Sequence, residues 1–195
     1  MKESIISLVA LAALTACATS YAGAWDDKVH GLLDTEVKKW LSDPVVVASI
    51  KRQNSQNRQL TQSDIDRLDK QWRSETRQED RPLIDGVLSS PLSLYLRNVA
   101  NQSAGLYAEI FIMDNKGLNV GQSAPTSDYW QGDEAKWQKT YLVGPESVFI
   151  DEIEYDTSAT RFQIQVSVPV VDPQTQSVIG AATIGLAMRQ LALRD

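Results

Sequence analysis

The sequence predicts an α+β domain, because its hydrophobic periodicity changes near Gly105. Before this glycine, apolar residues recur every three or four positions, as on one face of a helix. After it, apolar and polar residues alternate, as in strands with one packed face. Helices followed by strands with short turns are typical of helices packed on an antiparallel sheet. We therefore expect a long amino-terminal helix and further helices packed on five antiparallel strands.

A long amphipathic helix is expected to open the domain at Trp25. Asp43 and Pro44 should break and restart it, since proline suits a first helical position. The only histidine, His30, lies beside the apolar stripe of this helix. The stripe consists of Val29, Leu32, Leu33, Val37, Trp40 and Leu41.

Two more helices carry start signals. Thr61 and Asp64 form a capping box, which predicts a helix that begins at Thr61. Ser90 and Pro91 combine a cap with a proline, and the apolar stripe that follows them ends at Gly105.

The strands follow in the order "LYAEIFIM", "LNVGQS", "SVFIDEIEY", "RFQIQVSVPV" and "SVIGAATIGLAM". The first two should form a hairpin through the turn "DNKG". In the last strand, glycines and alanines permit a close approach from above. The fourth strand should pack Phe162, Ile164, Val166, Val168 and Val170, and turn Arg161, Gln163, Gln165 and Ser167 toward a wetter side.

Residues 1–24 are predicted to be an export signal, with Lys2, a short apolar run and then small residues. A single domain would then occupy residues 25–195. Two processing routes remain open: ordinary cleavage after "SYA" or "AGA", or lipidation of Cys17 within "LTAC". Either route predicts a bacterial periplasmic or exported protein, in the second case anchored to the membrane by lipid. Cys17 is the only cysteine, which leaves no disulfide and no cysteine chemistry in the mature domain.

The net charge of −6, with both signs interspersed, argues against nucleic acid and anionic lipid as partners. No later stretch has the apolar length of a membrane span. We therefore expect a domain without its own transmembrane or output module, which touches a membrane only through a lipid at Cys17.

Several segments together resemble the PDC, or single Cache, family of extracytoplasmic sensor domains. They are "EIFIMDNKGLNVGQSAPTSDYWQGDEAKW", "VFIDEIEYD", "FQIQVSVPVVDP" and "VIGAATIGL", in an ordered match over residues 25–188. The resemblance implies a long helix on a PAS-like sheet of five antiparallel strands. It also implies a small-molecule pocket between the sheet and the segment that joins its second and third strands, here Ser123 to Pro145.

Members of this family are usually the outward-facing parts of histidine kinases and chemoreceptors, which implies a membrane-bound receptor or kinase as a partner here. Relatives that bind amines and amino acids carry a tyrosine, an arginine five residues later and then a tryptophan–tyrosine pair. Counted from Tyr129, these positions hold Glu134, Lys136 and Trp137. The carboxylate clamp of those relatives is therefore missing, and their specificity is not transferred.

The stretch "TSDYWQGDEAKW" (residues 126–137), which we call the aromatic segment, supplies most candidate ligand contacts. Aromatic faces can wall a pocket and hold a cation, which a carboxylate would orient. Alternatively, the tryptophans anchor the segment to the sheet and the acids cap a helix that begins near Asp133; we favour both duties for the tryptophans and capping for the acids. The predicted ligand-binding residues are Asp128, Tyr129, Trp130, Asp133, Trp137 and Asp156.

Asp156 lies on one strand face with Glu152 and Glu154, where the three would either meet a cation or simply face solvent; we favour solvent. "DNKG" lacks the oxygen ligands of a calcium loop, and His30 has no partner for a zinc site. No nucleophile motif or cofactor fingerprint is present, so we expect no metal, no cofactor and no enzymatic activity.

The sequence therefore predicts an extracytoplasmic domain that binds a small molecule and presents its ligand state to a separate membrane partner. The main alternative is a structural or adaptor lipoprotein that uses the same fold to dock another protein.

Overall fold

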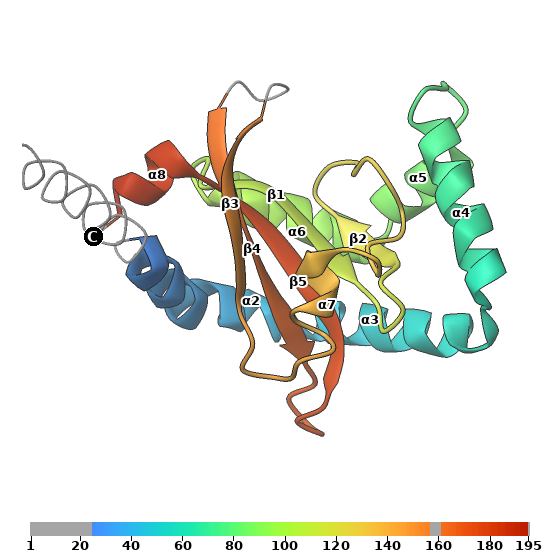
Figure 1. Cartoon of the computed structure of the whole chain (residues 1–195), viewed down its shortest axis with the longest axis horizontal. Coiled ribbons are helices and arrows are strands. Elements are labelled where there is room, and N and C mark those ends of the chain that lie inside the picture. The colour runs from blue at the N-terminus through green and yellow to red at the C-terminus, as the bar shows by residue number, and fades with distance from the viewer. Residues whose placement is uncertain (1–24, 157–160, 195) are drawn as a thin grey trace, which may run out of the picture.

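The computed structural model describes residues 25–156 and 161–194. Within them, five strands form one sheet in the order β2-β1-β5-β4-β3, and every neighbouring pair is antiparallel. Helices cover one face of this sheet and extend past its β2 edge (Figure 1). The predicted α+β class is confirmed. The expected export signal and Cys17 lie outside the described residues.

All five predicted strands are confirmed, because alternation and turn residues determine them locally. Their bounds are β1 Tyr107–Met113, β2 Asn119–Gln122, β3 Phe149–Asp156, β4 Arg161–Val171 and β5 Val178–Ala187. The β1–β2 turn contains Gly117 at φ 82°, a conformation that glycine adopts without strain.

The first helix occupies residues 25–41, and we call it the N-terminal helix. After residues 25–32 it passes through a π-helical segment, η1 (Leu33–Val37), into α2 (Lys38–Leu41). The predicted break follows: the Asp43 carboxylate accepts the Val45 amide at 2.9 Å and caps α3 (Pro44–Gln56). A short 3-10 turn, η2 (Asn57–Gln59), ends this helix.

The capping box at Thr61 is present, and α4 spans Gln62–Glu75. Ser90 likewise caps α6 (Pro91–Gln102). Between them lies α5 (Pro82–Leu88), a helix that the sequence analysis did not predict. Its first amides are capped from another helix: the Glu75 carboxylate accepts the amides of Leu83 and Ile84 at 2.9 and 3.0 Å. Two short helices complete the chain, α7 (Ala135–Gln138) and α8 (Met188–Ala192).

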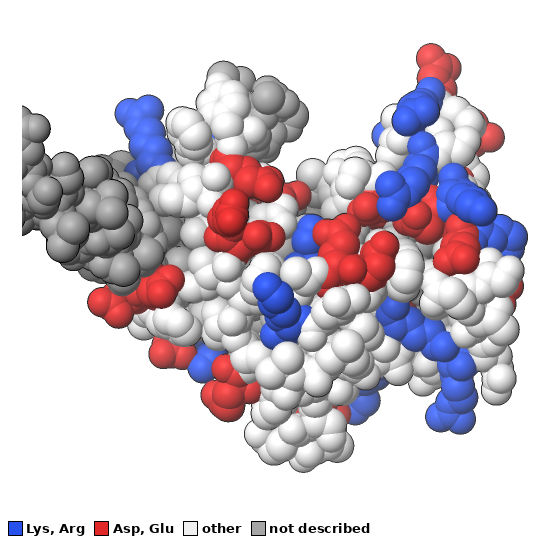
Figure 2. Space-filling view, in the orientation of Figure 1, with Lys and Arg blue, Asp and Glu red and all other residues white. Residues whose placement is uncertain are grey.

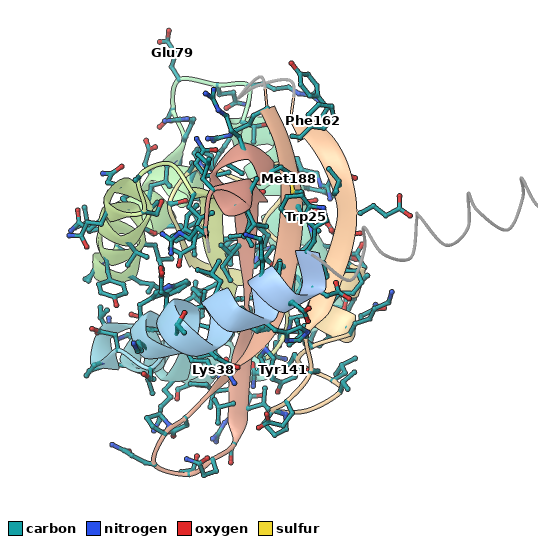
Figure 3. The ribbon with its side chains drawn as sticks, turned by 90° about the vertical axis from the view of Figure 1, so that its left-hand side faces the viewer. Trp25, Lys38, Glu79, Tyr141, Phe162 and Met188 are labelled. Atoms are coloured by element: carbon teal, nitrogen blue, oxygen red, sulfur yellow. The ribbon has the colours of Figure 1, made fainter. Side chains whose placement is uncertain are left out.

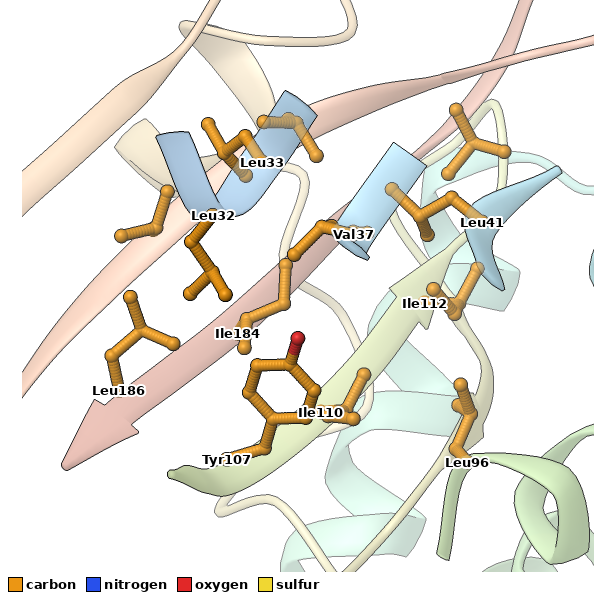
Figure 4. Packing of buried hydrophobic residues seen from close by; sticks show 14 of the residues in the cluster. Leu32, Leu33, Val37, Leu41, Leu96, Tyr107, Ile110, Ile112, Ile184 and Leu186 are labelled. Atoms are coloured by element: carbon orange, nitrogen blue, oxygen red, sulfur yellow. The ribbon is translucent and has the colours of Figure 1, made fainter. Parts of the chain in front are cut away.

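The main core lies between the N-terminal helix and the sheet. Figure 4 shows side chains of this helix directed at β1 and β5. Five of the six predicted stripe residues are buried, and Trp40 packs against them partly buried. Replacing such a residue by alanine costs about 2–5 kcal/mol, so this contact holds the helix firmly on the sheet.

The expected division of β4 into a packed and a wetter side is wrong at two residues. Ser167 is fully buried, because α7 covers the second face of the sheet there. Phe162, expected in the core, is 57% exposed. It lies at the end of β4, against Tyr155 of β3 rather than in the main core.

Candidate functional site

The sheet face opposite the N-terminal helix carries α7, and we call it the α7 face. Strand pairing places one residue of each strand in a row across it: Gln122, Phe111, Thr183, Ser167 and Phe149. Because side chains alternate along a strand, residues two positions away point to the same face. This face therefore combines aromatic, hydroxyl and amide side chains.

α7 closes one end of the α7 face. Trp137 of α7 stacks on Tyr141, with ring centroids 4.9 Å apart. Its indole Nε1 donates to the carbonyl of Asp114 in the β1–β2 turn at 3.1 Å. Beneath the two rings lie Phe111, Met113 and Ala181. Trp137 thus anchors α7 to the sheet and lies beside Phe111, a member of the row that crosses the α7 face.

Two hydroxyl groups lie in the sheet next to α7. Ser167 of β4 and Thr183 of β5 are both fully buried, and their oxygens are 2.9 Å apart. Each satisfies the other, which removes the cost of burying an unpaired hydroxyl.

Charged and polar groups surround the ring of Phe111. The ammonium group of Lys136 lies 5.5 Å from the ring centroid and forms an ion pair with Glu134 at 2.8 Å. Only 15% of the Lys136 side chain is exposed. Gln122, opposite Phe111 on β2, is fully buried, and its Nε2 has no hydrogen-bond partner among the described residues. A buried amide donor without an acceptor is costly and is typical of a site that meets a ligand or ordered water.

Beyond Phe111, away from the β1–β2 turn, the α7 face is polar. Gln165 donates to the Glu109 carboxylate at 2.8 Å. The Glu109 side chain crosses Gly185, where an added Cβ would come within 2.8 Å of its Cγ. Gln163 lies on the other side of this glycine, and its Oε1 has no hydrogen-bond partner in the described part of the chain. Gly185 thus leaves room for the half-buried carboxylate of Glu109. The sequence analysis expected the small residues of this strand to permit such a close approach.

The aromatic segment is fixed to α4 and to the β1–β2 turn. Asp69 of α4 accepts the backbone amides of Tyr129 and Trp130 at 2.9 and 3.1 Å. The Tyr129 ring stacks on Trp72 with centroids 5.2 Å apart, and Trp130 Nε1 donates to the Lys116 carbonyl at 2.8 Å. Both predicted contact residues therefore have extensive protein contacts.

Asp128 also has protein partners. Its carboxylate is buried and accepts hydrogen bonds from Arg73 of α4 and from Gln131. Its carbonyl accepts from Asn119 of β2 and from Thr126. These bonds join α4, β2 and the aromatic segment.

The predicted capping role of the acids is wrong. α7 begins at Ala135, its N-cap residue is Glu134, and no side chain makes a capping hydrogen bond. The Glu134 carboxylate pairs instead with Lys136. Asp133 is exposed, one residue before the cap, so the sequence placed the helix slightly too early.

Asp156 lies far along β3 from the aromatic segment, paired with Arg161 of β4. Glu152 and Glu154 are exposed, as expected for a solvated strand face. In the described residues, no cluster of three or more histidine, cysteine, aspartate or glutamate side chains is arranged to hold a metal. The structure thus gathers five of the six predicted residues in one region and leaves Asp156 apart.

Asp114, which the sequence analysis treated as a turn residue, is fully buried. Its Oδ2 accepts from Gln53 and Asn57 at 3.0 and 2.8 Å. Its Oδ1 accepts the amides of Lys116 and Leu118 at 2.8 and 3.0 Å. Asp114 therefore connects α3, the β1–β2 turn and, through its carbonyl, α7. Only the long-range partners reveal this role.

Burial controls the ionisation of the two tyrosines near α7. It raises the pKa of the Tyr129 phenol above its ordinary value, and the carboxylate of Asp114 adds to the effect. The same causes raise the pKa of Tyr141. Both rings are thus neutral at physiological pH.

Comparison with known proteins finds no matching family model and no matching curated protein. Solved structures do match. The sensor domain of the V. cholerae histidine kinase DctB is 13% identical, with a TM-score of 0.46, over 92% of this chain and 58% of that chain. The ligand-binding domain of the Pseudomonas aeruginosa PAO1 amino acid chemoreceptor PctC, in complex with GABA, is 15% identical, with a TM-score of 0.37, over 88% and 62%.

The ligand-binding domain of the Campylobacter jejuni chemoreceptor Tlp3, in complex with 4-methylisoleucine, is 14% identical, with a TM-score of 0.37, over 86% and 61%. All three are sensory domains of receptors. The chain spans about three fifths of their length. Within the described ranges, no helix is long and apolar enough to cross a bilayer.

Proposed function

We propose that this protein is an extracytoplasmic sensor domain that binds a small polar molecule over Phe111, between the α7 face and the aromatic segment. The observation that carries the proposal is the fully buried Gln122, whose Nε2 lacks a hydrogen-bond partner among the described residues. A hydrogen-bond acceptor on a ligand would satisfy it.

Charges of both signs define the class of ligand. Lys136 would contact an anionic group of the ligand, and Glu134 and Glu109 would contact a cationic group. Both carboxylates lie near Phe111: Glu134 pairs with Lys136 above the ring, and Glu109 is two residues along β1. A zwitterion or a polar amine fits these groups better than an apolar molecule does.

The residues predicted from the sequence take different proposed roles. Trp137 would contact the ligand directly, because it packs against Phe111. Asp128, Tyr129 and Trp130 would support binding indirectly, by holding the aromatic segment over the sheet. Asp133 would meet the ligand's cationic group from the edge of the site, and contact between Asp156 and the ligand stays a prediction from the sequence.

The ligand state would reach a separate membrane partner, a receptor or kinase, after export of the protein to the periplasm. Trp137 supplies a route, because its indole bonds to the Asp114 carbonyl and the Asp114 carboxylate bonds to α3. A ligand that shifts α7 would thereby shift the helical layer. Lipidation of Cys17 would keep the domain near such a partner.

A thermal-shift screen of amines, amino acids, carboxylates and nucleobases tests the proposal. A ligand at about one hundred times its dissociation constant stabilises the fold by about 2.7 kcal/mol, which raises the melting temperature by roughly 5–10 °C. Trp137→Ala should abolish the shift and remain folded by circular dichroism, whereas Trp137→Phe should keep part of it. If Trp137→Ala is unfolded, Trp137 is a core residue and its assignment to the site is wrong.

Two charge variants identify the groups of the ligand. Lys136→Gln should weaken binding of molecules that carry an anionic group, and Glu109→Gln should weaken binding of cationic ones. Asp66→Asn on the exposed side of α4 is the matched control and should change neither. A screen without any saturable shift would contradict the proposal and favour the docking-module alternative.

A further inference from the structure

A long trough runs along the N-terminal helix, beside β3, the segment that precedes β3 and the end of β4, on the opposite face of the sheet from the proposed ligand site. It consists of two adjacent cavities of about 620 and 800 Å³. Both are lined by His30, Glu146 and Val148, which makes them neighbours. Figure 3 shows the N-terminal helix lying across the sheet, with Trp25 at one end and Lys38 toward the other. At 1.5 Å per residue, residues 25–41 span about 25 Å.

Aliphatic side chains of the sheet form the floor of the trough. They are accessible there because the N-terminal helix does not cover β3. Strand pairing places Ile150 and Ile153 on the helix side of the sheet, opposite Val166 and Ile164. Val166 and Ile164 are buried, whereas Ile153 is 47% exposed. The apolar row of the sheet thus continues past the edge of the helical layer. Space remains there for another element beside the N-terminal helix.

The wall of the trough contains the π-helical segment η1, whose Leu33, Asp34 and Val37 all line the cavity. π-helical turns are rare, and they occur often at functional sites. Here the turn widens the helix at the point where its side chains line the trough.

The rim of the trough is acidic. One lysine, Lys38, faces it together with His30, and Lys38 already pairs with Asp34 at 2.7 Å. Figure 2 looks onto the α7 face, where acidic side chains lie over β3 and beside the N-terminal helix, and basic ones lie mainly over α4 and α5. The acidic residues of the trough itself follow from its lining. The lining carboxylates are Asp26, Asp34, Glu146, Asp151 and Glu152.

We propose that the trough docks a basic amphipathic helix of a partner protein. Such a helix would lie beside the N-terminal helix, cover the apolar row of β3 with its own apolar face, and direct lysines or arginines at the rim. A second copy of this chain would bring the same carboxylates against the rim, and an anionic membrane would be repelled in the same way. The charge therefore selects a basic partner. This inference does not depend on the proposed ligand site.

Fluorescence anisotropy with a labelled model peptide tests the proposal. The probe is a leucine–lysine peptide of about 18 residues, with leucines at helical spacing on one face. Two peptides serve as comparisons: one with glutamate in place of lysine, and one with the leucine–lysine order shuffled. The purified protein should bind the probe saturably, bind the shuffled peptide more weakly and fail to bind the glutamate peptide.

Variants locate the binding. Asp26→Asn combined with Glu146→Gln should weaken binding about fivefold at low salt, since each exposed charge contributes a fraction of a kcal/mol. Lys38→Gln, which removes the lysine of the rim, should strengthen it. Ser42→Trp would fill one end of the trough from an exposed position and should weaken binding without loss of core contacts.

Matched controls lie on α4 and the turn after it. Asp66→Asn combined with Glu79→Gln, and separately Lys70→Gln, change the same charges at exposed positions away from the trough. Equal losses in the trough and control variants would show nonspecific attraction and overturn the proposal. So would binding to phosphatidylglycerol vesicles without binding to the peptide. Sedimentation that shows a dimer disrupted by Ser42→Trp would assign the trough to a second copy and overturn it as well.

Discussion

Asp114→Ala is expected to destabilise the domain by about 4 kcal/mol. The wild-type carboxylate is fully buried and accepts four hydrogen bonds. Removing it leaves the amides of Lys116 and Leu118 without an acceptor, at about 1–3 kcal/mol each. Gln53 keeps contacts with two backbone carbonyls and adds little. The loss is therefore set mainly by the two turn amides.

Urea unfolding, followed by tryptophan fluorescence, measures this loss. The midpoint should fall while the slope stays constant, because the same surface is exposed on unfolding. The melting temperature should fall by roughly 10 °C. Asp114→Asn keeps one oxygen for the turn amides and should lose about half as much.

Asp133→Ala removes an exposed carboxylate of the aromatic segment and is the control, with an expected change below about 0.5 kcal/mol. A loss below about 1 kcal/mol in Asp114→Ala would refute the reasoning. It would show that the turn amides find other acceptors and that Asp114 does not join α3 to the sheet.

Three further predictions concern stability. Asp69→Ala removes the acceptor of two backbone amides of the aromatic segment and should cost about 3 kcal/mol in urea unfolding, with faster amide hydrogen exchange in that segment as the site-specific check. Burial raises the pKa of Tyr107 to about 12, so the folded state favours the neutral phenol. The stabilisation that comes from keeping Tyr107 neutral should be complete below pH 10 and be lost as the pH rises to 12. In Tyr107→Phe the free energy of unfolding should therefore change less with pH over that range. The hydrogen bond from Lys51 lowers the pKa of Asp172. The stabilisation that this pair gives the folded state should be present above pH 4 and be lost at lower pH. Lys51→Met should therefore destabilise the protein at pH 7 but much less at pH 2, and an equal loss at both would contradict the assignment.

The confirmed helices and strands depend on signals that lie within a few residues of each other. Asp43 caps the amide two residues later, and Thr61 and Asp64 cap each other's backbone. These bonds join residues two or three positions apart, so the residue types that make them can be recognised in the sequence. The helix α5 was missed because its cap, Glu75, comes from the preceding helix.

The candidate site likewise combines residues that the sequence indicates with residues that only the structure identifies. The sequence identified the aromatic segment from its aromatic and acidic residues, and Trp137 indeed packs against Phe111 on the sheet. It did not indicate Gln122, Lys136 or Glu109. Gln122 lies beside Phe111 because β2 pairs with β1, and Lys136 lies over the ring because α7 packs on the sheet. Glu109 lies two residues before Phe111 on β1, and no sequence motif marks it as a site residue.

The sequence by itself determined the order and type of most elements, since periodicity, caps and turn residues are local properties of the chain. It also identified the segment that lies over the sheet. Only the tertiary structure decided which side chains are buried and which bonds they make. Ser167 is buried because α7 covers it, and Asp114 is a connecting residue because Gln53 and Asn57 reach it. The acidic trough likewise arises because the N-terminal helix stops short of β3. Burial and pairing depend on distances between elements, and a linear pattern does not contain those distances.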